Sequence, residues 1–312
     1  MTAVPSPSTG DDRAAETAAA RRLRNVLEPI ASNVYFSPDV NDAFEALGFG
    51  PGVSAEGCLT IAEPSGYYCS RAACMGHVAG EVVVAAFGVF NPALIIPAVT
   101  RGWSIATAEQ VLDARERGAT ASLARILGDQ PAIAEATSVL QRGAAAGNAS
   151  GRFLYAGLRS LGVPSTPWGA LWRAVDSIRE YRGDSHLASW IATGLDPVEI
   201  GLITEIYYGM PCKRYHRGRG WTEADLDAGL ARLRDRHLIA GQPPRLTDAG
   251  TELRESIEVS TDVQQRPIIE AIGDDLDDLI DTLAPWSAAI VAASGFPTSV
   301  DQIPPMWGVL ER

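Results

Sequence analysis

The sequence predicts a mainly α-helical fold with short β-hairpins, built from two related units in tandem. Three observations support this fold class. Apolar residues recur at helical spacing along most of the chain, pairs of similar segments share one sequence offset, and a turn flanked by short strand-like stretches follows one helix. A hydrophobic content of 46% in 312 residues is sufficient for packed cores in about two domains.

The N-terminal region begins with a segment that is not expected to fold. Residues 1–15 are rich in Pro, Ser, Thr and Ala and have no periodic apolar face, so we expect a disordered tail. From Thr17 the apolar residues follow helical spacing through Ile30. A second short helix is expected from Val40 to Leu47.

Two pairs of similar segments indicate an internal duplication. Trp103 and Trp221 each follow a glycine and begin a helical pattern, and they are 118 residues apart (221 − 103). Glu81 and Glu199 have the same offset, and each opens an apolar helix that ends before a proline. We therefore expect one helical unit to be repeated.

The boundary between the two units is expected in the Gly- and Ala-rich stretch 143–151, whose residues suit a flexible connection. This places an N-terminal helical domain at residues 16–148 and a C-terminal domain at residues 149–312.

The second unit has the clearer pattern. Thr222 is suited to cap a helix whose buried stripe includes Leu226 and Leu233, and the Pro-containing turn 241–244 predicts a short β-hairpin. A long helix is then expected from Thr251 to about Ala271, with a break before Pro267. A last helix is expected from Asp274 to Leu283, ending near Pro285.

The order of these elements, with Arg245-Leu246-Thr247-Asp248-Ala249-Gly250 before a long amphipathic helix, is similar to MarR-type winged-helix proteins. The runs Arg182-Gly183-Asp184-Ser185-His186, Ser70-Arg71-Ala72-Ala73 and Phe90-Asn91-Pro92 resemble more specifically the actinobacterial helix-turn-helix family called SalK-like. This resemblance covers most of the chain beyond residue 25. It implies a degenerate winged-helix domain at 16–148 and a MarR-like one at 149–312, in an arrangement that imitates a MarR dimer.

The composition limits the classes of partner and the compartment. The chain has 38 acidic and 26 basic residues, a net charge of −12, so its overall field repels phosphate backbones. We find no long apolar stretch and no signal-peptide pattern, which predicts a cytoplasmic protein that does not enter membranes. The four cysteines follow no disulfide spacing and are expected to be thiols.

The winged-helix resemblance raises the question of DNA binding. The first turns of the expected recognition helix carry Glu223, Asp225 and Asp227, which would oppose phosphates and base edges. Nucleic acid is therefore a disfavoured partner. A basic loop at residues 213–219, which includes Arg219 and Tyr215, leaves three alternatives open: a solvated loop, an anion contact or nucleic acid.

A polar cluster at residues 182–186 is the first candidate site. We expect it at the start of a helix, where Asp184 would orient His186 as an acid or base and Arg182 would hold an anionic group. The ordinary alternative is that Asp184 is only the cap of the helix, with His186 at the surface and Arg182 as the salt-bridge partner within this cluster.

The matching segment of the first unit supplies further candidate ligand-binding residues. A buried Arg71 would need an anionic partner and is a candidate anchor for an acidic ligand, with Tyr67 and Tyr68 as candidates for lining the same cavity. The alternative is that Arg71 lies at the helix edge with its charged end in water. Trp190 is a candidate for lining the pocket between the units, with core packing as the alternative.

The pattern Cys69-x4-Cys74-x2-His77 contains metal-ligating residue types but matches no closed structural site. Core packing of the cysteines is the alternative, and we assign no metal. The sequence has no dinucleotide-binding, P-loop, zinc-protease or nucleophile-elbow motif, so it specifies no cofactor.

The hypothesis from the sequence is a winged-helix scaffold, monomeric or homodimeric, that binds a small anionic molecule, with acid–base transformation of that molecule in specialised metabolism as its extension. The alternative is a MarR-type ligand-responsive transcription regulator. A third reading is a non-catalytic partner protein.

Overall fold

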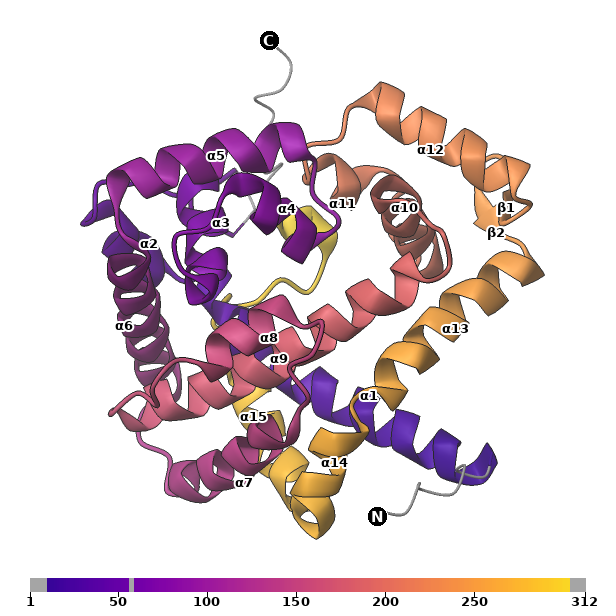
Figure 1. Ribbon diagram of the computed structural model, residues 1–312. Coiled ribbons are helices and arrows are strands. Elements are labelled where there is room, and N and C mark those ends of the chain that lie inside the picture. Colours follow the sequence, from indigo (N-terminus) through magenta and orange to yellow (C-terminus); the bar gives the residue numbers. More distant parts are fainter. Residues whose placement is uncertain (1–9, 56–58, 304–312) are drawn as a thin grey trace.

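The computed structural model describes residues 10–55 and 59–303, and this part of the chain is mainly helical, as expected (Figure 1). The helices are α1 (Gly10–Ser32), α2 (Pro38–Glu45), α3 (Pro64–Ala72), α4 (Gly80–Phe87), α5 (Pro92–Ile105), α6 (Ala108–Leu127), α7 (Ile133–Ala146), α8 (Phe153–Arg159), α9 (Pro167–Ile191), α10 (Pro197–Tyr207), α11 (Arg214–Arg217), α12 (Glu223–Asp235), α13 (Asp248–Val263), α14 (Arg266–Ile272) and α15 (Leu276–Ala292). Strands β1 (Ile239–Ala240) and β2 (Arg245–Leu246) form an antiparallel pair.

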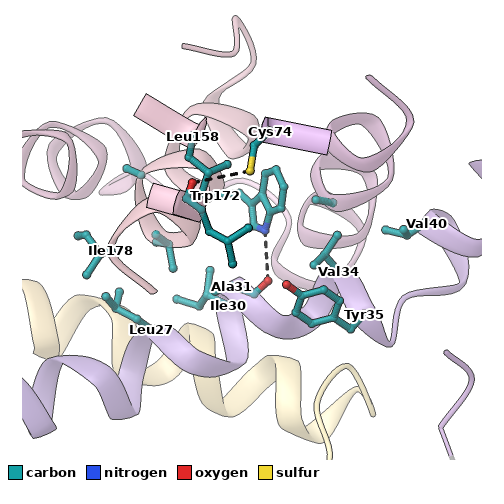
Figure 2. Packing of buried hydrophobic residues seen from close by; sticks show 14 of the residues in the cluster. Leu27, Ile30, Ala31, Val34, Tyr35, Val40, Cys74, Leu158, Trp172 and Ile178 are labelled. Atoms are coloured by element: carbon teal, nitrogen blue, oxygen red, sulfur yellow. Dashed lines mark hydrogen bonds between the residues drawn. The ribbon is translucent and has the colours of Figure 1, made fainter. Parts of the chain in front are cut away.

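The body of the molecule consists of the helices that pack around α9. Thr166 caps α9 by accepting a hydrogen bond from the Gly169 N–H, and Pro167 occupies the first helical position, where its missing N–H has no intrahelical partner to lose. Helices α1, α6, α7, α8 and α13 contact α9. Figure 2 shows how the buried Trp172 fills this core, with its indole N–H donating to the Ala31 carbonyl at 3.3 Å.

A second, smaller hydrophobic cluster lies in residues 190–257, which we call the small module. It packs α10 against α12, and the hairpin and the start of α13 complete it. The α12 N-terminus has a capping box between Thr222 and Asp225, and the hairpin pairs Ile239 with Leu246. These elements confirm the predicted capped helix and hairpin. Figure 1 shows α12 and the hairpin at the edge of the molecule, on the opposite side from α7.

The boundary between the two hydrophobic clusters does not coincide with the domain boundary predicted between residues 148 and 149. The cluster of the body contains residues of α1 and α6 as well as residues of α9, α14 and α15, which follow residue 148. In the part of the chain that the structure describes, residues 239–246 contain the only sheet, and the turn between α6 and α7 has no strand pair. The tandem duplication therefore stays a prediction.

Several predicted helix ends were wrong. Helix α1 begins at Gly10, because the Ala-rich stretch before Thr17 has a high helix propensity and continues the helix; residues 1–9 of the expected tail lie outside the described residues. Trp103 lies in the last turn of α5, since Thr107 caps the next helix, α6. Helix α15 continues past Pro285, because its buried face continues through Trp286 and Ile290.

Other predicted ends agree with the structure. The helices expected at 17–30 and 40–47 are present as α1 and α2, and the break expected before Pro267 separates α13 from α14. Gly250 follows the hairpin at a point where a Cβ atom would lie 2.0 Å from the Leu238 carbonyl oxygen, so this junction requires glycine. Among the described helices, none combines the length and apolar content needed to cross a membrane.

Candidate ligand site

Two adjoining cavities lie along α1 and α9. The first, which we call the helix cavity, has a volume of about 230 Å³ and is lined mainly by α1, α9, α13 and α14. The second, the module cavity, has a volume of about 340 Å³ and lies between the body, the loop 210–219 of the small module and the segment 296–303. Glu28 and Arg179 line both cavities and form the wall between them.

The shared wall is an ion pair. The Arg179 Nε–H donates to Glu28 Oε1 at 3.1 Å, its Nη1 donates to Glu180 Oε1 at 3.0 Å, and the Ser32 hydroxyl donates to Glu28 at 2.7 Å. Burial raises the pKa of Glu28, but the Arg179 guanidinium and the Ser32 hydroxyl outweigh burial and hold this pKa below its ordinary value. Glu28 is therefore ionised at neutral pH and compensates the charge of Arg179.

The module cavity is walled by aromatic rings and contains a second arginine. Arg219 lies over the ring of Tyr215, with 4.4 Å from Cζ to the ring centroid, and over the ring of Phe90 at 5.2 Å. Tyr35 and the predicted ligand residue Tyr67 line the same cavity, 5.3 Å apart between ring centroids. The Arg219 cation lowers the pKa of Tyr215, against the effect of burial.

Arg219 differs from the other Lys and Arg residues of the loop, because each of those has a carboxylate partner. Lys213 and Arg217 pair with Glu223, and Arg214 lies 3.7 Å from Asp301. Among the described residues, by contrast, no ion pair includes Arg219. Arg219 instead contacts aromatic rings and the Tyr215 hydroxyl, while the buried Glu205 carboxylate attracts it from beyond ion-pair distance.

The loop that carries Arg219 is held by a buried carboxylate. Glu205 is fully buried in α10 and accepts hydrogen bonds from the backbone N–H groups of Lys213 at 2.5 Å and His216 at 2.7 Å. Lys213 has a left-handed conformation, with φ of 71°, which these bonds help to hold. Burial raises the pKa of Glu205, and the backbone N–H donors oppose this effect.

Three predicted site residues, Arg71, Arg182 and His186, line the helix cavity. Both arginines already have anionic partners in the protein. Arg71 makes two hydrogen bonds to Glu180, at 2.9 and 2.7 Å, and the Arg182 Nη2 donates to Glu258 and Asp262 at 2.9 and 2.8 Å. Arg182 is thus in a salt bridge, but with Glu258 and Asp262 of α13 and not within the 182–186 cluster, where the ordinary alternative placed it.

The predicted pair of Asp184 and His186 is not formed. Both residues lie in the middle of α9, because the helix begins at Pro167 and continues through Gly183, and side chains two positions apart on a helix face different directions. Asp184 accepts a hydrogen bond from the Tyr155 N–H at 3.0 Å, whereas His186 Nδ1 lies 3.2 Å from the Thr261 hydroxyl and 3.9 Å from Glu258. Burial lowers the pKa of His186 to about 4, so its imidazole is neutral at pH 7.

The overall arrangement can be compared with known proteins. The model of a helix-turn-helix family matches residues 20–297, which include both the body and the small module. The chain belongs to this helix-turn-helix family. No curated protein and no solved structure matches the chain.

In this helix-turn-helix protein, two predicted ligand residues belong to the cores. Tyr68 is fully buried among aromatic rings of the body, with the Phe90 ring centroid 5.4 Å away, and Trp190 is buried in the cluster of the small module. Neither residue lines the two cavities. Trp190 is therefore a core residue, as the core-packing interpretation of the sequence has it.

The candidate metal-ligating residues lie in separate surroundings. The Cys69 thiol lies 3.7 Å from the Val99 carbonyl, the Cys74 thiol lies 3.7 Å from the Leu154 carbonyl, and the His77 ring packs on Trp103. Burial raises the pKa of both thiols to about 12, so they are protonated at neutral pH. In the described part of the chain, no three His, Cys, Asp or Glu side chains lie close enough together to bind a metal ion.

The face of α12 that a helix-turn-helix protein would present to DNA carries acidic side chains. Glu223 and Asp227 are exposed, and both pair with Lys213, at 3.2 and 2.5 Å. Two arginines at the other end of the helix, Arg232 and Arg236, pair with acidic residues at the start of α10. Lys213, Arg232 and Arg236 are therefore directed to carboxylates of the same module.

The sequence pointed to part of this site. The basic loop at residues 213–219 includes Arg219 and Tyr215, and an anion contact was one of the three readings that its sequence left open. Glu28, Tyr35 and Arg179 were missed. These three residues occur in α1, the following turn and α9, and no local pattern distinguishes them from ordinary helix residues.

Proposed function

We propose that this helix-turn-helix protein binds a small aromatic anion in the module cavity. The observation that carries the proposal is Arg219, a half-buried cation in an aromatic cavity with no carboxylate partner among the described residues. A cation that is partly removed from water and left without a carboxylate attracts an anionic group more strongly than a solvated one does.

The size and walls of the module cavity support an aromatic ligand. Its volume of about 340 Å³ lies at the lower end of the range of roughly 300–1,000 Å³ that is usual for small-molecule sites. The rings of Tyr35, Tyr67 and Phe90 offer stacking and edge contacts to a planar ligand. A fused bicyclic carboxylate is small enough for such a space.

Calorimetric titration with 2-naphthoate tests this proposal. We expect binding to the wild-type protein and at least a tenfold loss of affinity in Arg219→Gln, because hydrogen bonds to a charged group contribute about 1.5–3 kcal/mol. Arg217→Gln is the matched control, since Arg217 belongs to the same loop but pairs with Glu223 outside the cavity. Equal affinities of wild type and Arg219→Gln, or no binding of 2-naphthoate to the wild-type protein, would contradict the proposal.

The extension to acid–base chemistry is not part of this proposal. It depended on Asp184 orienting His186, and these side chains point to different partners. Glu258, rather than Asp184, is the carboxylate near the imidazole.

A second candidate function is a MarR-type, ligand-responsive transcription regulator, which the helix-turn-helix family match favours. The resemblance also supports further proposals: tandem winged-helix units, membership of the SalK-like actinobacterial group, and action in specialised metabolism as a cytoplasmic monomer or homodimer.

A further inference from the structure

The charged groups at the module cavity can be counted. Three of them line it: Glu28, Arg179 and Arg219. Behind this layer, Glu180 pairs with both Arg71 and Arg179, so one carboxylate serves two guanidinium groups. The two carboxylates Glu28 and Glu180 thus balance Arg71 and Arg179. Arg219 remains as the lining cation without an ion pair among the described residues, and Glu205 of α10 attracts it from behind the loop.

Other cations near this cluster have partners of their own. Arg115 pairs with Asp176 at 3.2 Å, and Arg182 pairs with Glu258 and Asp262 on the far side of the helix cavity. Arg254 and Arg21 also pair with Glu258 and Asp262, and none of these groups lines the module cavity. Its charge balance therefore depends on Glu28, the one carboxylate that lines it among the described residues.

We infer that Glu28 determines the charge of the ligand: the module cavity accepts an aromatic monoanion while Glu28 neutralises Arg179, and it accepts an aromatic dianion when Glu28 is neutral. This inference rests on the proposed function, because it concerns the selectivity of the same cavity. The physical reason is that a second ligand carboxylate would lie near the ionised Glu28, and like charges in a partly desolvated site repel each other.

Glu28→Gln is a mild change for the fold. The glutamine side chain has the same shape as glutamate, and its carbonyl oxygen at the Oε1 position can accept from both the Arg179 Nε–H and the Ser32 hydroxyl. Its amide nitrogen at the Oε2 position cannot accept, so the second contact to Arg179 Nε is lost. Arg179 keeps its hydrogen bond to Glu180. The variant therefore leaves one more cation in the cavity and keeps the contacts of Arg179 to Glu180 and to one oxygen at position 28.

The test compares two probes that share one ring system, 2-naphthoate and naphthalene-2,6-dicarboxylate, by calorimetry at constant salt concentration. We expect the wild-type protein to prefer the monoanion, and Glu28→Gln to shift the ratio of the two dissociation constants at least tenfold toward the dianion. Glu116→Gln is the matched control, because the Glu116 side chain is 34% exposed and pairs with Arg173, while Glu28 is 35% exposed and pairs with Arg179. The control should leave the ratio within a factor of two.

The outcomes separate this inference from the proposed function. If the wild-type protein binds 2-naphthoate but Glu28→Gln leaves the ratio unchanged, Glu28 does not select the ligand charge and the inference is wrong. The same holds if Glu116→Gln shifts the ratio as much as Glu28→Gln does. If neither probe binds to the wild-type protein, the proposed function fails and the inference fails with it. Melting temperatures confirm that each variant is folded.

Discussion

Asp184 is a buried carboxyl group that forms no ion pair with any residue that the structure describes. Its Oδ2 accepts from the Tyr155 N–H, while its Oδ1 is buried and has no hydrogen-bond partner in the described part of the chain. Burial raises the pKa of Asp184 to about 7, and the hydrogen bond from Tyr155 only partly opposes this effect. A protonated carboxyl group satisfies this environment better than a carboxylate does.

This environment predicts a pH-dependent effect of Asp184→Asn. In the unfolded chain the carboxyl group ionises near pH 3.9, whereas in the folded protein it keeps its proton until about pH 7. The folded state then binds more protons between these values, so the wild-type protein loses stability as the pH rises through this range, by up to about 1.4 kcal/mol per pH unit. The amide does not ionise.

Urea unfolding at pH 4, 5.5, 7 and 8 measures this effect. The free energies of unfolding of wild type and Asp184→Asn should be closest at pH 4. As the pH rises to about 7, the free energy of unfolding of wild type should fall relative to that of the variant. The difference should not change further above pH 7. Titration of other groups is common to both proteins and cancels in the difference. A difference that is the same at every pH would show that Asp184 is ionised in the folded protein.

The sequence identified several residues of the cavities but not their partners. Arg71 was recognisable because a charge in an apolar stretch needs a specific environment, Tyr67 because it is close to Arg71 in the sequence, and Arg182 because it belongs to a cluster of polar residues. Their partners are distant along the chain: Glu180 is 109 residues from Arg71, and Glu258 is 76 residues from Arg182. A single sequence does not show which distant carboxylate will pair with a given arginine, because the fold determines which residues meet.

At the scale of elements, the turn between α10 and α12 depends on a close approach of His216 to α10. His216 is fully buried, its Nε2 lies 2.8 Å from the Pro197 carbonyl, and burial lowers its pKa to about 3. A Cβ atom on Gly201 would lie 1.8 Å from the His216 ring. Glycine at 201 is therefore needed for the loop that carries Arg219 to pack on α10.

Gly201→Ala should reduce the free energy of unfolding by about 1–3 kcal/mol, the usual cost of overpacking a well-packed core. Gly183→Ala is the control in another helix interior, where the added Cβ would have its nearest contact at 3.4 Å. That variant should be neutral or more stable by about 0.5–1 kcal/mol, because alanine favours a helix over glycine. Chemical denaturation of both variants checks the contrast. Equal effects would show that the His216 contact does not limit position 201.

The helices also show which sequence signals are dependable. The predicted cap at Thr222 was correct because a side-chain cap and an apolar stripe coincide there. The predicted helix start at Asp184 was wrong because a glycine beside a capping residue resembles a helix start, although Thr166 and Pro167 supply the actual start. Tertiary packing of α9 on five other helices overrides the local preference of Gly183.

At the scale of the whole molecule, the mainly helical class could be predicted because helical periodicity is a local property. The arrangement of the cores could not. Helices α14 and α15 return to the body after the small module, so the body contains segments from both ends of the described chain. The predicted repeat with an offset of 118 residues gives no indication that α14 and α15 pack on the body.

The distribution of charge over the whole molecule separates the two candidate functions. The net charge of −12 and the exposed Glu223 and Asp227 on α12 both oppose a polyanion. In a gel-shift experiment with the upstream DNA of its own gene at about 0.1 M salt, where weak non-specific contacts are already screened, we expect no retardation by the wild-type protein.

The variant Glu223→Gln/Asp227→Gln refines this prediction. It removes two carboxylates from the exposed face of α12 and frees Lys213 and Arg217 from their partners, so this face becomes cationic. We expect weak DNA binding that appears at low salt and disappears as salt rises, because phosphate contacts release counterions. The opposite pattern would favour the regulator: retardation by the wild-type protein at about 0.1 M salt that is lost in Arg214→Gln/Arg217→Gln. In that case the acidic residues of α12 would not prevent docking, and the basic loop at residues 213–219 would bind the phosphates.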